Sequence, residues 1–407
     1  MFWRSCSGNL GSENDEHQKR QEAATLLREL VSNDEVIPVV VICHSRVEVF
    51  RESLASLLGD VRGLDPRKVL VAQDGTNSEV AAVARDEFGL ALVQRNRDQD
   101  AITPRGNWGR ERGAGAHIAA QYRFAIDAGF AHFPSAPALI LAEDDLVYSP
   151  DFAEFLTRAA ALVAEDESLW IASAWNDNGY RGVARDLRRV LRTDFFPGLG
   201  WTMQRSLWRQ ELRLAWPSDH YDWHLRKAEV AKGRECLYPE VARVAHRGWE
   251  GSFMDFTHHV RHFAGIVHAQ DARYRWRDDD ISVGREDAYD AALALTLAHR
   301  AWHVRHGEDL LSALTWIPGA VLVIWHRSSL DPRMNFRFRP LARRLGIWED
   351  PRRGARRGVH ELWLRNARVI LMNVFDVQEK TQKMQDRRGP QGRPMPPRRS
   401  AHLCFGA

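Results

Sequence analysis

The sequence predicts an α/β fold built on a doubly wound, mostly parallel sheet, with a smaller lobe toward the C-terminus. Two observations carry this prediction. Short apolar runs alternate with helix-length segments through the first half of the 407-residue chain, as they do in βαβ units. The first run, residues 37–42, is almost unbroken, which is typical of a parallel strand covered on both faces.

Each element is predicted from its own pattern. We expect strands at the apolar runs 37–42, 68–73, 90–94, 138–142 and 169–174. We expect the intervening helices at residues 49–58, 78–87, 116–129 and 151–164. A Gly-rich loop is expected at 103–115. Beyond residue 271 the alternation weakens, and the smaller lobe is indicated by a helix at 288–304, a strand at 320–325 and a segment at 358–374.

The domain organisation follows from changes in composition. Residues 1–36 form a polar leader with one short amphipathic helix expected at 21–31, and residues 37–270 form the main α/β domain. The lobe takes residues 271–376, and the Arg- and Pro-rich residues 377–407 are expected to be a disordered tail. The leader has no apolar core typical of a signal peptide, and no stretch is long enough to span a bilayer.

Overall charge and cysteine usage exclude some classes. A formal net charge of +3 is small for this length, so we expect no nucleic-acid partner, which would require a strongly basic face. Four scattered cysteines match no metal-ligand spacing. His258 and His262 are spaced as on one helix face but lack the Glu of a zinc-protease motif, so a structural role is favoured.

Polar residues follow four of the predicted strands, at residues 44–46, 74–75, 143–145 and 176–178. In open α/β sheets, ligands bind outside the carboxyl ends of the strands. The sequence therefore predicts a ligand site at this edge of the sheet.

The strongest of these clusters is the carboxylate triplet Glu143, Asp144 and Asp145. Three adjacent carboxylates repel one another unless a cation lies between them, and a divalent ion shared with substrate phosphates meets that need. The alternative is a solvated acidic turn before the next helix, whose start is indicated at residues 149–151.

Two aromatic segments are further candidates. Asp222 lies between Tyr221 and Trp223, where partial desolvation would favour a general base. The alternative is a helix N-cap in a Trp-rich packing cluster. The Gly-punctuated loop at 195–201 could bring backbone close to a ligand or be a buried turn.

Taken in order, these motifs resemble glycosyltransferase family 13, the β-1,2-N-acetylglucosaminyltransferases that act on N-glycan mannose or on O-linked mannose. The resemblance covers residues 37–374 and is strongest at Glu143–Asp145, Ser173–Gly179, Arg192–Trp201, Trp216–Pro217 and Gly233–Cys236. It implies a Rossmann-like GT-A fold, Mn²⁺ as cofactor, UDP-N-acetylglucosamine as donor, a mannose-terminated glycan or glycoprotein as acceptor, and inversion at the anomeric carbon.

The resemblance also implies roles for the residues at the sheet edge. Asp145 would bind the metal that bridges the two donor phosphates. Glu143 and Asp144 would contact the nucleotide-sugar, and Arg46 and Asp74 would hold the uridine.

The remaining roles come from the aromatic segments. Asp222 matches the catalytic base, which accepts the proton of the mannose 2-hydroxyl while the metal acts as a Lewis acid on the departing diphosphate. Tyr221 takes the place of a family Trp, and Arg226 matches a family Arg. Leu199 would lie against the donor sugar.

The chain departs from the family pattern at several places. Gln121 replaces a His near the uracil, and Trp223 replaces a second Asp beside the base. The segment 246–254, where the family carries a donor-gating loop, matches poorly. The expected partners of Cys43 and Cys236 are replaced by Gly75 and Ile171, so the family disulfides are expected to be absent.

Three functional alternatives stay open. We favour an N-glycan acceptor over O-linked mannose, and a catalytically silent glycan-binding module is the alternative from another class. An RNA-binding role for the basic tail ranks last. The resemblance implies a Golgi location, whereas the lack of a visible signal or anchor leaves a soluble or cytoplasmic placement open.

Overall fold

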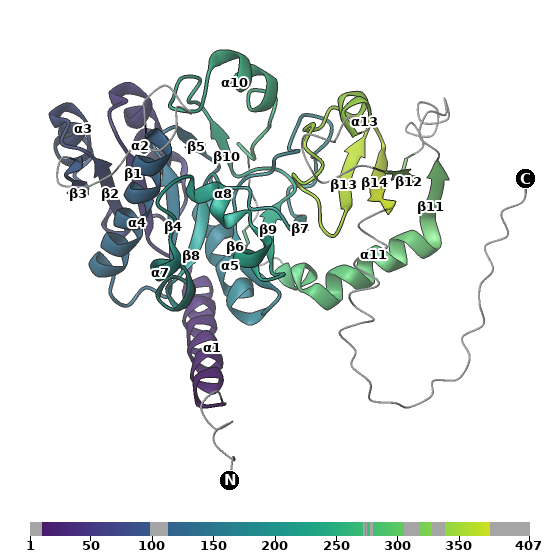
Figure 1. Cartoon of the computed structure of the whole chain (residues 1–407), viewed down its shortest axis with the longest axis horizontal. Coiled ribbons are helices and arrows are strands. Elements are labelled where there is room, and N and C mark those ends of the chain that lie inside the picture. Colours follow the sequence, from purple (N-terminus) through teal and green to yellow (C-terminus); the bar gives the residue numbers. More distant parts are fainter. Residues whose placement is uncertain are drawn as a thin grey trace, which may run out of the picture.

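The computed structural model describes residues 10–97, 113–271, 273, 275–276, 280–304, 318–327 and 338–374 (Figure 1). The expected tail at 377–407 and most of the expected Gly-rich loop, residues 103–112, lie outside the described residues. The predicted division into domains stays a prediction, and the described elements are given below as they occur.

The central sheet has five strands in the order β3-β2-β1-β4-β8. Four of them are parallel, and β8 pairs antiparallel with β4 at one edge. The strands are β1 (Val39–Cys43), β2 (Val69–Asp74), β3 (Ala91–Arg95), β4 (Ala138–Glu143) and β8 (Trp201–Gln204). This arrangement confirms the predicted α/β class with a mostly parallel sheet.

Helices cover both faces of this sheet. Val39 and Val41 point into one apolar core, and Val40 and Ile42 point into another, because successive strand residues face opposite sides. The first core includes residues of α2 (Val47–Asp60), α3 (Ser78–Ala82), which continues as a π-helical turn, Val83–Glu87, and α5 (Phe152–Glu165). The second core includes residues of α4 (Ala114–His132). Burial on both faces explains why the strand runs lack polar alternation.

One predicted strand lies elsewhere. The run expected at 169–174 forms β6 (Leu169–Ala172), which belongs to a separate three-stranded sheet with β9 (Glu235–Pro239) and β7 (Val190–Thr193). The expectation that it extends the central sheet is therefore wrong. An apolar run identifies a buried strand but not its partner, and here the partner, β9, comes more than 60 residues later.

The C-terminal part contains a four-stranded sheet in the order β11-β12-β14-β13, drawn at the opposite end of Figure 1 from β3. Its elements are α11 (Glu286–Arg300), β11 (Ala301–Val304), β12 (Val321–His326), α13 (Phe338–Leu345), β13 (Val359–Leu364) and β14 (Ala367–Asn373). The helix expected at 288–304 ends at Arg300, because residues 301–304 pair with β12 as a strand. This sheet and α13 share an apolar core of their own.

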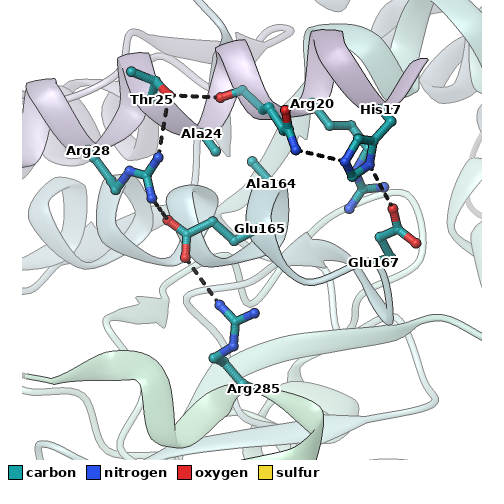
Figure 2. Close-up of a pocket in the computed structure, with 10 residues that line it drawn as sticks. His17, Arg20, Ala24, Thr25, Arg28, Ala164, Glu165, Glu167 and Arg285 are labelled. Atoms are coloured by element: carbon teal, nitrogen blue, oxygen red, sulfur yellow. Dashed lines mark hydrogen bonds and ion pairs between the residues drawn. The ribbon is translucent and has the colours of Figure 1, made fainter. Parts of the chain in front are cut away.

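Helix α1 (Leu10–Ser32) is longer than the helix expected at 21–31. It packs along α5, where Ala24 and Leu27 join the first core. Figure 2 shows the polar groove between the two helices, where Arg28 pairs with Glu165 at 3.2 Å and Glu165 also contacts Arg285. The described part of the leader is therefore docked on the α/β core. No helix among the described ranges is both long and apolar enough to cross a bilayer.

The remaining elements are short and connect these layers. They are η1 (Pro66–Lys68), β5 (Leu146–Tyr148), α6 (Arg205–Leu207), η4 (Trp208–Leu212), α7 (Arg213–Ala215), α8 (Tyr221–Leu225), α9 (Ala228–Ala231), β10 (Val244–His246), α10 (Phe256–His262) and η5 (Ile281–Gly284). Of these, α8, β5 and β10 position residues of the candidate site.

Candidate active site

Three of the four predicted clusters meet at one edge of the central sheet. Strands β1, β2 and β4 are neighbours and run in the same direction, so their carboxyl ends lie side by side. The contact between His44 Nδ1 and the backbone oxygen of Asp74, at 2.6 Å, joins the first two ends. The sheet edge predicted from sequence is thus a real concentration of polar side chains.

The carboxylate triplet at the end of β4 is tied to β1 through Arg46. One guanidinium nitrogen of Arg46 donates to Asp144 Oδ1 and, at 2.8 Å, to Asp145 Oδ2. Asp144 and Asp145 are only 4% and 6% exposed. The alternative of a solvated acidic turn is therefore wrong, because two of the three carboxylates are buried.

Burial shifts the pKa values of the triplet in different directions. It raises the pKa of Glu143 to about 7, with a further increase from the charge of Asp145. Burial likewise raises the pKa of Asp144 to about 6, although Arg46 opposes it. For Asp145 burial alone would raise the pKa, but His246 and then Arg46 lower it below its usual range. Asp145 is therefore the member held as a charged carboxylate.

Asp145 has the features of a cation ligand. Its Oδ1 atom is buried and has no hydrogen-bond partner, which is unusual for a carboxylate oxygen in a protein interior. The described residues contain no group of three or more His, Cys, Asp or Glu side chains arranged around a metal. These residues fit an ion that takes its other ligands from substrate phosphates, which is the usual way in which Mg²⁺ and related ions bind.

Asp74 forms ion pairs with Arg95 and Arg97, whereas the triplet forms them with Arg46. Its Oδ1 accepts from Arg95 at 2.5 Å, and its Oδ2 pairs with Arg97 at 3.2 Å. Arg95 also donates to Gln121 at 3.2 Å. The resemblance implies that Arg46 and Asp74 hold the uridine, and this stays a prediction: Arg46 contacts the carboxylates of the triplet, and Asp74 contacts Arg95 and Arg97. Sequence reasoning missed Arg95, although it ends β3 directly opposite Asp74.

Helix α8 carries the candidate base. Asp222 Oδ2 accepts from Arg226 at 2.6 Å, one helical turn away, and Arg226 also donates to the backbone oxygen of Phe196 at 3.1 Å. The N-cap of α8 is His220, so the alternative that Asp222 caps this helix is wrong. Arg226 thus orients Asp222 and ties α8 to the aromatic loop.

Tyr221 connects this helix to the carboxylates. Its ring stacks on Tyr122 at 3.9 Å and on Trp216 at 5.9 Å, and its hydroxyl donates to Glu143 at 3.3 Å. Glu143 also accepts a hydrogen bond from the Tyr122 hydroxyl. The structure therefore brings the candidate base helix and the carboxylate triplet together through one aromatic side chain.

The loop from Phe195 to Trp201 has a constrained backbone. Leu199 has φ of +47°, between Gly198 and Gly200, which are also in the left-handed region. Such a conformation is unusual for a branched residue, and strained backbone of this kind clusters at functional sites. The Ser173 hydroxyl donates to the Gly198 oxygen at 2.6 Å and holds the loop in place.

The segment after β10 lies against the triplet, a contact that the sequence did not reveal, although its position matches the family's donor-gating loop. The backbone N–H of Arg247 donates to the backbone oxygen of Asp145 at 2.7 Å, and Arg46 donates to the backbone oxygen of Glu250 at 3.1 Å. A Cβ on Gly248 would lie 2.3 Å from Asp145 Oδ2. Gly248 was the one sign in the sequence that the backbone passes close to another group here. Only the fold shows that this group is the Asp145 carboxylate.

Other predicted residues lie outside this group. Asp177 pairs with Arg353 at 2.7 Å, and Asn178 donates to the Arg353 oxygen at 3.0 Å. The cluster after β6 therefore contacts the C-terminal segment, because β6 is not part of the central sheet. His262 stacks on Trp348 at 4.1 Å, in keeping with a structural role.

The cysteines in the described ranges follow the expectation from the resemblance. Cys43 and Cys236 are both buried free thiols. Cys43 ends β1, and Cys236 pairs with Ile171 across β9 and β6, where the family pattern has a cysteine. The two family disulfides are thus absent.

Comparison with known proteins agrees with this arrangement. The model of the GNT-I family matches residues 6–383. The alpha-1,3-mannosyl-glycoprotein 2-beta-N-acetylglucosaminyltransferase of Arabidopsis thaliana is 32% identical over 257 residues, which cover 62% of this chain and 56% of that protein. This chain thus spans little more than half of that relative.

Solved structures share lower similarity. S. aureus TarS in complex with UDP-GlcNAc is 15% identical with a TM-score of 0.34, over 54% of this chain and 60% of that chain. A mannosyltransferase from Pyrobaculum calidifontis, in complex with GDP-Man and Mn²⁺, is 18% identical with a TM-score of 0.31, over 56% and 67%. Since the family match extends through the sheet, the carboxylate triplet and helix α8, the chain belongs to the GNT-I family.

Proposed function

We propose that this protein is a metal-dependent glycosyltransferase that moves N-acetylglucosamine from UDP-N-acetylglucosamine to the 2-hydroxyl of a terminal mannose on a glycoprotein glycan. The observation that carries the proposal is the link between two parts of the chain: the carboxylate triplet at the end of β4 and the Asp222 helix meet through Tyr221 and Glu143. A nucleotide-sugar transferase needs both parts, one for the diphosphate and one for the acceptor hydroxyl.

Each residue has a defined task in the proposed reaction. Asp145 would hold the divalent cation, which when bound neutralises charge on the departing diphosphate. Asp222 would accept the acceptor proton on Oδ1, since Arg226 holds Oδ2. A single displacement with the base on the side of the acceptor inverts the anomeric carbon, by the logic of inverting hydrolysis.

The donor would lie along the sheet edge. We propose that Arg46 and Asp74 contribute to uridine binding, that Glu143 and Asp144 face the nucleotide-sugar, and that Leu199 lies against the donor sugar. The family membership and the left-handed backbone of Leu199 support these assignments.

The acceptor is proposed to be an N-glycan mannose arm, with O-linked mannose as the alternative. The curated relative named for the N-glycan reaction favours the first. A catalytically silent glycan-binding module is the alternative from another class, and the Arg226-oriented Asp222 argues against it, since a lectin needs no base. A Golgi location is part of the proposal, on family grounds alone.

The deciding experiment is a transfer assay with UDP-N-acetylglucosamine, Mn²⁺ and separate mannose acceptors of the two kinds. Transfer to the N-glycan acceptor with a β-1,2 product is the expected result. Transfer only to O-linked mannose would move the protein to the other branch. Glycan binding without transfer to either acceptor would refute the enzymatic proposal.

A further inference from the structure

His246 lies beside Asp145 although 100 residues of sequence separate them. Strand β10 pairs antiparallel with β5, and His246 is opposite Leu146, the residue that follows Asp145. The next backbone N–H, from Arg247, donates to the backbone oxygen of Asp145 at 2.7 Å. The pairing of β10 with β5 therefore fixes the position of the His246 backbone beside Asp145.

The two side chains have the separation of neighbouring metal ligands. His246 Nε2 lies 3.3 Å from Asp145 Oδ2, and each side chain is 7% exposed. Adjacent ligands of an octahedral ion at about 2.1 Å from the metal are about 3.0 Å apart. The His246 ring is held by Phe263, with ring centres 4.9 Å apart, and by His259, at 5.7 Å. The imidazole and the carboxylate are therefore close enough to contact one ion.

A simple ion pair does not account for this arrangement. Arg46 and His246 both approach the same oxygen of Asp145, Oδ2, while Oδ1 is buried without a partner. A carboxylate that served only to balance buried charge would have partners on both oxygens. The neutral imidazole nitrogen is, in contrast, a common ligand of divalent transition ions.

We infer that His246, through Nε2, is a second protein ligand of the divalent cation held by Asp145. The inference rests on the proposed function and extends it, because the resemblance implies a ligand role for Asp145 alone. An imidazole ligand favours Mn²⁺ and later transition ions over Mg²⁺, which prefers oxygen. His246 is therefore assigned a role in metal selectivity as well as affinity.

The first test is spectroscopic. Mn²⁺ is added to the full-length protein together with UDP, and pulsed electron paramagnetic resonance is used to detect coupling of the metal to a bonded imidazole nitrogen. We expect a ¹⁴N coupling that disappears in His246→Asn. Bound Mn²⁺ without any nitrogen coupling in the unmodified protein would overturn the inference.

The second test measures affinity and selectivity by calorimetry with Mn²⁺ or Mg²⁺ in the presence of UDP. His246→Asn should weaken Mn²⁺ binding at least about tenfold and lower the preference for Mn²⁺ over Mg²⁺. His262→Asn is the control, since His262 stacks on Trp348 and not on the His246 ring, and it should leave both quantities unchanged. Unchanged Mn²⁺ affinity and selectivity in His246→Asn would overturn the inference.

Asp145→Asn separates this inference from the proposed function. If Asp145→Asn loses Mn²⁺ binding while His246→Asn keeps it, the second ligand is wrong and the proposed function stands. If neither variant changes Mn²⁺ binding, the metal site itself is wrong, and both proposals fail.

Discussion

Gly248 offers the sharpest single perturbation of the site. A Cβ built there would lie 2.3 Å from Asp145 Oδ2 and 2.8 Å from Arg46 Nη1. Since an ordinary contact needs about 3.4 Å or more, the loop or the carboxylate must move by about 1 Å in Gly248→Ala. The backbone at Gly248 is not in the left-handed region, so the substitution tests the contact and not the local conformation.

The expected effect follows from this displacement. Overpacking of this size costs about 1–3 kcal/mol, and a misplacement of about 1 Å in a catalytic site can cost about a hundredfold in rate. We therefore expect Gly248→Ala to bind UDP with Mn²⁺ much more weakly and to transfer sugar about a hundredfold more slowly.

Gly251 supplies a matched control in the same loop. A Cβ there would have its nearest neighbours at 3.7 Å, an ordinary contact distance. Calorimetry with UDP and Mn²⁺, together with thermal unfolding of both variants, measures the result. Equal losses in Gly248→Ala and Gly251→Ala, or normal binding by Gly248→Ala, would refute the reasoning.

Three further predictions concern other residues. Asp222→Asn should keep donor binding and lose transfer about a hundredfold in a steady-state assay, whereas Asp219→Asn should stay active; the reverse result would mean that the base is misassigned. Glu235 is buried and pairs with the guanidinium groups of Arg192, Arg356 and Arg357. Glu235→Gln should therefore lower the free energy of unfolding in urea by about 3–5 kcal/mol. Glu48→Gln, which removes an exposed ion pair, should have no measurable effect. Burial lowers the pKa of His360 to about 3, so the unfolded chain takes up a proton below its usual pKa of 6.5 and the folded chain does not. Stability should thus be lost as pH falls from 6.5 toward 3, by about 1.4 kcal/mol per unit, and His360→Leu should show a shallower loss; an unchanged slope would exclude His360 as the cause.

Local patterns were enough to predict the sheet edge. The strands β1, β2 and β4 were predicted from continuous apolar runs, and parallel topology then placed the residues that follow them together. The triplet Glu143–Asp145 and Asp222 could be singled out because each combines residue types with a specific chemical use. The helices around the sheet were also predicted to within a few residues.

Pairing between distant segments could not be predicted from the sequence. The partner of β6 is β9, and this moved the cluster at 176–178 away from the sheet edge. The sequence also could not show which guanidinium group contacts which carboxylate. In the structure Arg46 contacts the triplet, and Arg95 contacts Asp74. These strand and side-chain pairings depend on the distances between segments in the folded chain. A local sequence pattern does not contain those distances.

The pairing of β5 with β10 shows why the segment 246–251 belongs to the site despite its poor match to the family. In an antiparallel pair, a shift by one residue turns every side chain to the other face. Such a slip would move His246 away from Asp145 and put Arg247 in its place, a cation that cannot bind a metal. Gly248 then allows the chain to turn closely past Asp145 toward Arg46 and Glu250. In the proposed cation site, the strand register, the His246 imidazole and Gly248 serve the same geometry, and we expect a change in any of them to affect cation binding first.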